Sequence, residues 1–153
     1  MLTCLPVSLC SWDYRVLGAE AGPAQLTFNW FSEQGTILLG ADAFEVVKHG
    51  PMSGHWTLEN AGQVVADAQK PSAMFRAYEL SMAGADFTVQ PQSAFTRCFD
   101  IGFGGRTVGS IRPAHPFTRR AFIECNSQVP ELVQLFAFWL TAIAWRRAQQ
   151  NNN

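Results

Sequence analysis

Charged residues are scarce in this sequence, and their balance is almost neutral. The chain has 153 residues, with 11 basic and 12 acidic side chains and a charged fraction of 15%. A nucleic-acid-binding domain usually carries a marked excess of basic residues, so the net charge of -1 argues against that class. The apolar fraction of 48%, with 12 Phe and 5 Trp, instead predicts one globular domain with a substantial core.

The sequence also lacks the features of an exported protein. Its apolar N-terminus has no basic segment and no small-x-small cleavage site, so it does not resemble a signal peptide. The cysteines form neither a close pair nor a C-x-x-C motif, and we expect reduced thiols at Cys4, Cys10, Cys98 and Cys125. These features predict a cytoplasmic protein whose residues 1–13 form a poorly ordered leader.

Motifs for nucleotide binding and nucleophilic catalysis are absent. The sequence has no P-loop and no G-x-S-x-G elbow. Gly102 and Gly104 have the spacing of a dinucleotide fingerprint, but Thr107 stands where the third glycine is required, and strand-like residues follow it. The Gly104-Gly105 pair therefore predicts a hairpin turn.

Metal binding and acid–base catalysis have little support in the sequence. His49 and His55 flank a Gly-Pro turn, but a metal site would need two further converging ligands that the local sequence does not supply. Carboxylates such as Asp67 and Asp100 stand singly and give no local signature of a hydrolase. We expect no metal, no cofactor and no enzymatic activity; an enzyme that uses scattered carboxylates is one alternative.

Apolar residues alternate with a period near two between residues 25 and 125. Short runs rich in Phe, Val, Ile, Thr and Trp are punctuated by Gly, Pro, Asn and Asp, which is typical of an antiparallel meander. Hairpin turns are expected at 60–62, 83–86 and 104–105, where glycine permits a positive φ. The predicted strands are 25–31, 36–39, 43–48, 54–60, 64–69, 74–81, 86–91, 95–103, 106–112 and 119–126.

Residues 127–147 form the one long helical pattern, which is apolar on nearly every face. Between Leu132 and Trp145 only Gln134 and Thr141 are polar, so the helix has no face suited to solvent. That stretch reaches roughly 21 Å at about 1.5 Å per residue, short of the roughly 30 Å hydrocarbon layer of a bilayer. We expect a helix at about 128–148 that is enclosed by protein; a membrane-anchored protein with an inserted C-terminal helix is the alternative.

The two patterns together predict a mainly β fold. About ten strands do not pair in one flat sheet without curling, so a closed antiparallel β-barrel that surrounds the C-terminal helix satisfies both patterns. We expect a single domain over residues 14–148, with Asn126 or Ser127 capping the helix and a disordered tail at 149–153. The core side chains of the helix are predicted to be Leu132, Leu135, Phe136, Trp139, Leu140 and Ile143.

Three segments carry a resemblance to a known family. Residues 56–65 (WTLENAGQVV) are similar to a recurring strand–turn–strand unit, residues 99–111 resemble a strand pair that ends in a V-G-x-I step, and an apolar helix followed by two arginines closes the chain. This layout resembles the tubby-like superfamily, most nearly its phospholipid scramblase and LURP-one-related branches. The resemblance implies a closed barrel of about twelve strands threaded by a hydrophobic C-terminal helix, and an association with phospholipids. The acidic calcium-binding segment and the palmitoylated cysteine stretch of the scramblase branch have no counterpart here.

One acid-free segment carries the expected site. Residues 101–123 contain four arginines and no acidic residue, which would present a cationic surface to phosphate groups. We expect a non-enzymatic small domain, peripheral at a membrane, that binds a ligand or anionic phospholipid headgroups. The expected anion-binding residues are Arg106, Arg112, Arg119 and Arg120.

Overall fold

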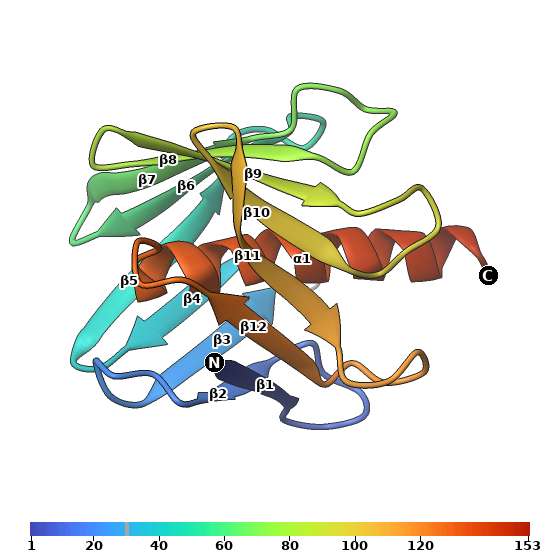
Figure 1. Cartoon of the computed structure of the whole chain (residues 1–153), viewed down its shortest axis with the longest axis horizontal. Helices are drawn as coiled ribbons and strands as arrows, with labels where there is room; N and C mark the ends of the chain where they lie inside the picture. Colours follow the sequence, from blue (N-terminus) through green and yellow to red (C-terminus); the bar gives the residue numbers. More distant parts are fainter. Residues whose placement is uncertain (30) are drawn as a thin grey trace.

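The computed structural model describes residues 1–29 and 31–153, which form twelve strands and one helix (Figure 1). The strands are β1 (Leu2–Pro6), β2 (Tyr14–Leu17), β3 (Ala24–Asn29), β4 (Gln34–Leu39), β5 (Asp42–Lys48), β6 (His55–Asn60), β7 (Gln63–Gln69), β8 (Tyr78–Met82), β9 (Ala85–Pro91), β10 (Phe99–Phe103), β11 (Arg106–Pro113) and β12 (Ala121–Cys125). The helix α1 spans Glu131–Asn151.

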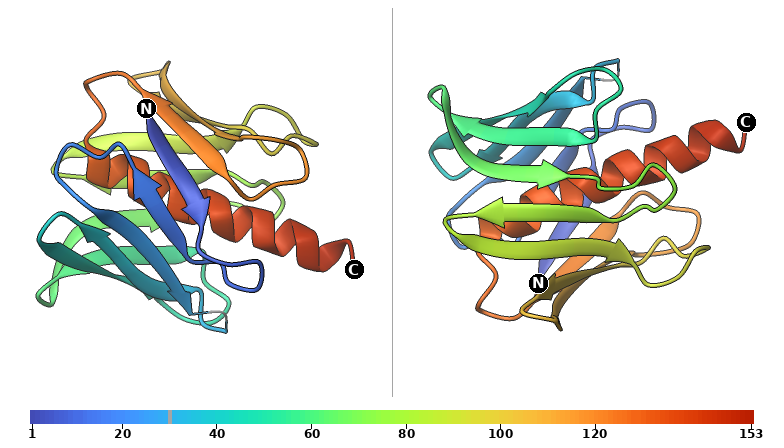
Figure 2. Two further views of the ribbon diagram at one scale, coloured as in Figure 1. Left: turned by 90° about the horizontal axis from the view of Figure 1, so that it is seen from below. Right: turned by 90° about the horizontal axis from the view of Figure 1, so that it is seen from above.

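The strands form a closed up-and-down barrel. Every strand pairs antiparallel with its neighbours in sequence, and β1 closes the barrel against β12, with Leu2 opposite Ile123. Figure 2 shows α1 running through the barrel. The prediction of a closed antiparallel barrel of about twelve strands around a C-terminal helix is confirmed.

The helix supplies the centre of the core. Side chains that alternate along the strands point inward, as in β3, where Leu26 and Phe28 are buried and Thr27 between them is exposed. Every residue of α1 between 135 and 145 is buried. The predicted core residues Leu135, Phe136, Trp139, Leu140 and Ile143 are at most 2% exposed, and Leu132 is partly buried against the same core.

A close contact fixes the position of α1 beside β3 and β4. The ring of Trp139 stacks on Phe28 with 3.7 Å between centroids and 14° between planes. Gly35 faces Phe28 across the β3–β4 pair, and a Cβ atom at Gly35 would lie 2.5 Å from Cη2 of Trp139 and collide with the Thr27 carbonyl oxygen. Glycine is therefore required here by the close approach of both β3 and the helix.

The N-terminal prediction was wrong. Residues 1–13 are not a poorly ordered leader, because β1 pairs with both β2 and β12 and its Leu2 and Cys4 side chains are buried in the core. Without β1, the other eleven strands would form an open sheet with β2 and β12 at its edges. β1 pairs with both of these strands and so closes the barrel. The alternation of Leu2 and Cys4 with more exposed neighbours is the sequence signal of this strand.

The helix boundaries also differ from the prediction. Pro130, with φ -57° and ψ 145°, is the N-cap residue and makes no side-chain cap bond, whereas Asn126 accepts a hydrogen bond from the Gln128 amide in the preceding turn. The helix therefore starts at Glu131 rather than near 128, and it continues through Asn151 into the predicted tail. No helix in the described part of the chain combines the length and the hydropathy needed to cross a membrane.

Two predicted strands begin too early. The runs 74–81 and 95–103 correspond to β8 and β10, which start at Tyr78 and Phe99, and their first residues lie in connecting loops. The predicted run 25–31 contains residue 30, which lies outside the described residues, and β3 ends at Asn29. The hairpin turns at 60–62, 83–86 and 104–105 are confirmed, with positive φ at Ala61, Gly62, Ala83, Gly84, Gly104 and Gly105.

Candidate functional site

The two ends of the barrel are built from different connections. At one end, called the turn end, β4–β5, β6–β7, β8–β9 and β10–β11 are joined by two-residue turns that contain only Gly and Ala. At the other, called the loop end, the connections are longer, and the end of α1 emerges among them (Figure 1). The described residues of the loop end are 7–13, 31–33, 49–54, 70–77, 92–98 and 114–120, with 146–153 of α1 and the residues after it.

Basic residues are concentrated at the loop end. It holds seven of the 11 basic residues and two of the 12 acidic ones, a net charge of +5, so the remaining four basic and ten acidic residues give the rest of the molecule -6. The basic residues are Lys70, Arg76, Arg97, Arg119, Arg120, Arg146 and Arg147, and the acidic ones are Asp13 and Glu33. A molecule of net charge -1 therefore has a strongly basic end.

Three of these arginines tie neighbouring loops together. Arg76 donates from Nη2 to the carbonyl oxygens of Ala94 and Thr96, at 2.8 and 3.0 Å, and so joins the β7–β8 loop to the β9–β10 loop. Arg97, in that second loop, donates to the Pro116 carbonyl at 2.8 Å in the β11–β12 loop. Each bond is charge-assisted and restricts the loop that it reaches.

Arg119 continues this sequence of contacts from the β11–β12 loop to the β1–β2 loop. Its guanidinium donates to the carbonyl oxygens of Ser8 at 2.7 Å and Leu9 at 2.9 Å, and also to that of Ser11. It lies 5.2 Å from the ring centroid of Trp12. Four consecutive loops of the loop end are thus held by arginine–carbonyl bonds.

A cavity of about 890 Å³ lies among these loops. Arg76, Arg97 and Arg119 line it together with Trp145, over whose ring the Arg97 guanidinium lies at 4.5 Å. Burial lowers the pKa of Arg97 from its ordinary value. The cavity combines cationic and aromatic walls, which suits an anion that carries an apolar group.

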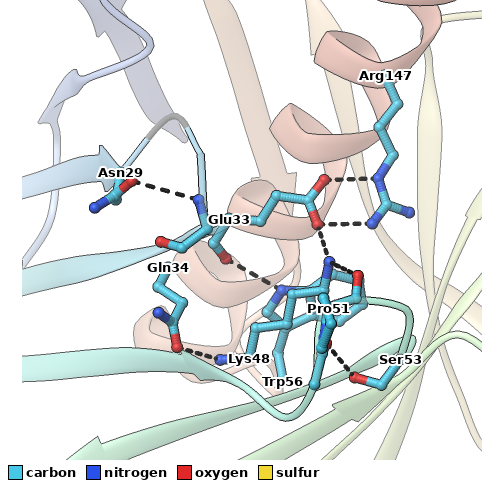
Figure 3. A network of polar contacts seen from close by, with 10 residues as sticks. Asn29, Glu33, Gln34, Lys48, Pro51, Ser53, Trp56 and Arg147 are labelled. Atoms are coloured by element: carbon cyan, nitrogen blue, oxygen red, sulfur yellow. Dashed lines mark hydrogen bonds and ion pairs between the residues drawn. The ribbon is translucent and has the colours of Figure 1, made fainter.

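Glu33 connects the helix to the opposite side of the same end (Figure 3). Its carboxylate accepts from Lys48 Nζ at 2.7 Å and from both Nε and Nη2 of Arg147, at 2.8 and 2.7 Å. Its carbonyl oxygen accepts from Trp56 Nε1 at 3.2 Å. Glu33 has a φ of 54°, so a strained backbone conformation is retained in this network.

The electrostatics of this network favour the charged forms. Burial alone would raise the pKa of Glu33, but the hydrogen bonds and charges of Arg147 and Lys48 outweigh it and hold that pKa below its ordinary value. The hydrogen bond to Glu33 raises the pKa of Arg147. Glu33 and these two cations therefore form a structural tie between the β3–β4 loop, β5 and the end of α1.

The structure does not bring the four predicted arginines into one patch. Arg106 begins β11 at the turn end, whereas Arg119 and Arg120 follow that strand at the loop end; the eight residues of β11 span roughly 26 Å. Arg112 lies on the barrel wall, 3.2 Å from Glu124. Arg112 and Arg120 do share the Phe122 ring, at 5.0 and 5.7 Å from its centroid.

His49, in the β5–β6 connection, and His55, at the start of β6, lie together. The rings of His49 and His55 stack with 4.6 Å between centroids, His55 Nε2 contacts the Asp67 carboxylate, and His49 Nε2 lies 2.7 Å from the Thr57 hydroxyl. Thr57 is itself buried, at 4% exposure, and donates to Glu59 at 3.2 Å. Within the described residues no group of three or more ligating side chains could hold a metal ion.

Comparison with known proteins does not identify a family. No protein-family model, no curated protein and no solved structure matches this chain. The functional interpretation therefore depends on the chain's own residues.

Proposed function

We propose that this protein is a non-enzymatic domain that binds anionic phospholipid headgroups at a membrane surface, using the loop end of its barrel. The single observation that supports this most strongly is the separation of charge. The loop end holds seven basic and two acidic residues, while the rest of the molecule is net negative. Each basic residue held near an anionic membrane contributes about 1 kcal/mol of binding.

The charge separation also sets the orientation of the encounter. An anionic surface attracts the +5 end and repels the remainder, which carries -6, so the barrel turns its loop end toward the lipid before contact. This attraction acts within a Debye length of about 10 Å at 0.1 M salt, so binding is expected to weaken as the ionic strength increases.

The proposal includes a remote relationship to the tubby-like superfamily, nearest its scramblase and LURP-one-related branches. Its support is the agreement between the fold that the resemblance implies and the observed barrel of twelve strands around a hydrophobic helix. In this protein the proposed lipid contact differs from the segment predicted from the sequence: Arg119 and Arg120 belong to it, while Arg106 and Arg112 lie elsewhere.

Cosedimentation with phosphatidylserine-containing and pure phosphatidylcholine vesicles tests the proposal. We expect binding to the anionic vesicles only, and its weakening at high salt. Two double variants separate location from net charge, because each lowers the net charge by 3, from -1 to -4. Arg120→Glu with Gln149→Glu changes exposed residues at the loop end, and Arg106→Glu with Gln63→Glu changes exposed residues at the turn end.

The loop-end variant should bind more than about tenfold more weakly, whereas the turn-end variant should bind nearly as well as the wild type. Absence of wild-type binding at low salt, or equal losses in the two variants, would refute the proposal. Circular dichroism of both variants checks that the barrel is retained.

A further inference from the structure

Each described connection of the loop end presents a large apolar side chain to solvent. One residue from each of the six connections is between 88% and 101% exposed: Leu9, Phe31, Met52, Met74, Phe95 and Phe117. Phe75, beside Met74, is 68% exposed. We refer to the first six residues as the apolar tips.

The apolar tips are confined to that end. Elsewhere in the described chain the most exposed large apolar side chain is that of Met1, the first residue, at 70%, followed by Val64 at 58%. Single exposed apolar side chains are common on proteins, but six at one end, one from each connection, form a pattern that suggests contact with a partner.

Folding of the barrel does not account for the apolar tips. The turn end shows that these strands can be joined by two-residue turns of Gly and Ala. The exposed tips bury almost none of their surface, so they contribute little hydrophobic stabilisation. Yet the loops that carry four of them are held by the bonds of Arg76, Arg97 and Arg119 to neighbouring carbonyls. The molecule therefore keeps costly apolar groups in defined positions.

The combination of apolar tips with basic residues matches the chemistry of a bilayer interface. Phe, Leu and Met side chains gain free energy by entering the boundary between headgroups and acyl chains, and arginines beside them remain at the level of the phosphates. Membrane surface binding becomes stable when an apolar contribution is added to an electrostatic one. A partner protein with an acidic apolar groove would need to match six separate loops around a projecting helix end.

We infer that the apolar tips insert into the interfacial layer of an anionic phospholipid bilayer, so that the barrel docks end-on with the C-terminal end of α1 facing the lipid. This inference rests on the proposed function and deepens it, since headgroup binding alone requires no insertion. It identifies the docking surface, the insertion elements and the orientation of the barrel relative to the membrane.

Fluorescence quenching by acyl-brominated lipids measures the insertion. Cys10 is exposed beside Leu9 and accepts a thiol-reactive environment-sensitive fluorophore, after Cys98 and Cys125 are replaced by Ala. The matched control carries the label at Gln63→Cys, an exposed turn-end position, with Cys10→Ser. With phosphatidylserine-containing vesicles, the loop-end label should be quenched and shifted to the blue, and the turn-end label should not.

A second pair of variants tests the tips themselves. Phe95→Ser with Phe117→Ser should lower the binding that remains at high salt by about tenfold or more, because the apolar contribution is lost. Val64→Ser with Leu17→Ser removes exposed apolar side chains elsewhere and should leave that binding unchanged.

The outcomes separate the two proposals. Binding to anionic vesicles with neither label quenched would overturn insertion and leave headgroup binding intact, whereas no vesicle binding would overturn both. A dimer in lipid-free solution that disappears in the Phe95→Ser, Phe117→Ser variant would also overturn the inference, since it would assign the tips to a second copy of the chain.

Discussion

The two ends of this barrel share one sheet and one central helix, yet their surfaces have opposite character. Four of the five strand connections at the turn end are two-residue turns of Gly and Ala, and this end belongs to the acidic part of the molecule, while the loop end carries seven basic residues and six exposed apolar tips. Both ends tie the helix to the barrel: at the turn end Glu131 accepts hydrogen bonds from the amides of Glu20 and Ala21, and at the loop end Arg147 binds Glu33.

This difference separates what the fold requires from what it does not. Short turns with positive φ are sufficient to connect antiparallel strands, as the turn end demonstrates. Longer loops with exposed Phe, Met and Leu add nothing to that requirement and increase the risk of association. Folding stability therefore does not account for the apolar tips of the loop end, whereas the proposed membrane contact does.

The largest expected effect concerns the core that both ends share. Phe136→Ala removes a fully buried ring from the centre of α1 and should lower the free energy of unfolding by about 3–5 kcal/mol. Urea denaturation monitored by fluorescence and by circular dichroism measures the change. A loss below about 1 kcal/mol would contradict the placement of the helix inside the barrel.

Smaller losses of unfolding free energy are expected when the contacts that attach α1 to the barrel at its two ends, those of Glu33 and of Glu131, are removed. Glu33→Gln leaves Lys48 and Arg147 without their carboxylate and should cost about 1–3 kcal/mol at neutral pH, whereas Glu131→Gln affects only hydrogen bonds to backbone amides and should cost about 1 kcal/mol or less. Thermal denaturation of the two variants provides the comparison. Equal losses would show that the ionic partners of Glu33 add no stability.

The ion pairs of Glu33 also predict that the stability of the protein depends on pH. The pKa of Glu33 is lower in the folded protein than its ordinary value of 4.5, so its stabilising contribution is complete above that value and is lost as the pH falls through the folded pKa. The difference in unfolding free energy between the wild type and Glu33→Gln should therefore narrow in acid. A difference that stays constant from pH 7 into that acid range would contradict the assigned ion pairs.

The smallest effect on stability is expected at the apolar tips. Phe117 is 93% exposed, so Phe117→Ser should change the free energy of unfolding by less than about 0.5 kcal/mol, in contrast to Phe136→Ala. Chemical denaturation of the variant in the absence of lipid measures it. A loss of several kcal/mol would mean that the Phe117 ring packs within the fold and is not held out for a partner.

The core was predictable from the sequence because its patterns are local. The apolar faces of residues 132–145 required burial, and the period-two segments required strands, so the barrel around a helix followed from residues that are close in sequence. The Gly-Gly and Ala-Gly turns were likewise readable from their need for positive φ. The prediction of a leader at residues 1–13 excluded β1, and the four-residue strand β2 precedes the first predicted run at 25–31.

The site was harder to predict because it is assembled from separated segments. Glu33 and Arg147 lie 114 positions apart, so no local pattern joins them. The acid-free segment 101–123 suggested four arginines in one patch, but β11 carries the chain from one end of the barrel to the other and separates Arg106 from Arg120. Arg119 and Arg120 instead lie at the loop end together with basic residues of three other segments, 70–77, 92–98 and 146–147.

The predicted starts of β8 and β10 were wrong for the same reason that the loop end was not predicted from the sequence. Met74, Phe75 and Phe95 were assigned to strands because apolar residues normally indicate burial, yet they are exposed loop residues. A sequence signal was nevertheless present: from residue 31 to residue 120, connections that contain a large apolar residue alternate with turns of Gly and Ala. Alternate connections of an up-and-down barrel lie at the same end, which collects the apolar tips there.

The most direct test of the loop end as the membrane contact is amide hydrogen exchange of the protein free and bound to phosphatidylserine-containing vesicles. We predict slower exchange on binding in the six connections of the loop end and at residues 146–153, and unchanged exchange at the turns 61–62, 83–84 and 104–105. Protection confined to the turn end or to the barrel wall would contradict the account.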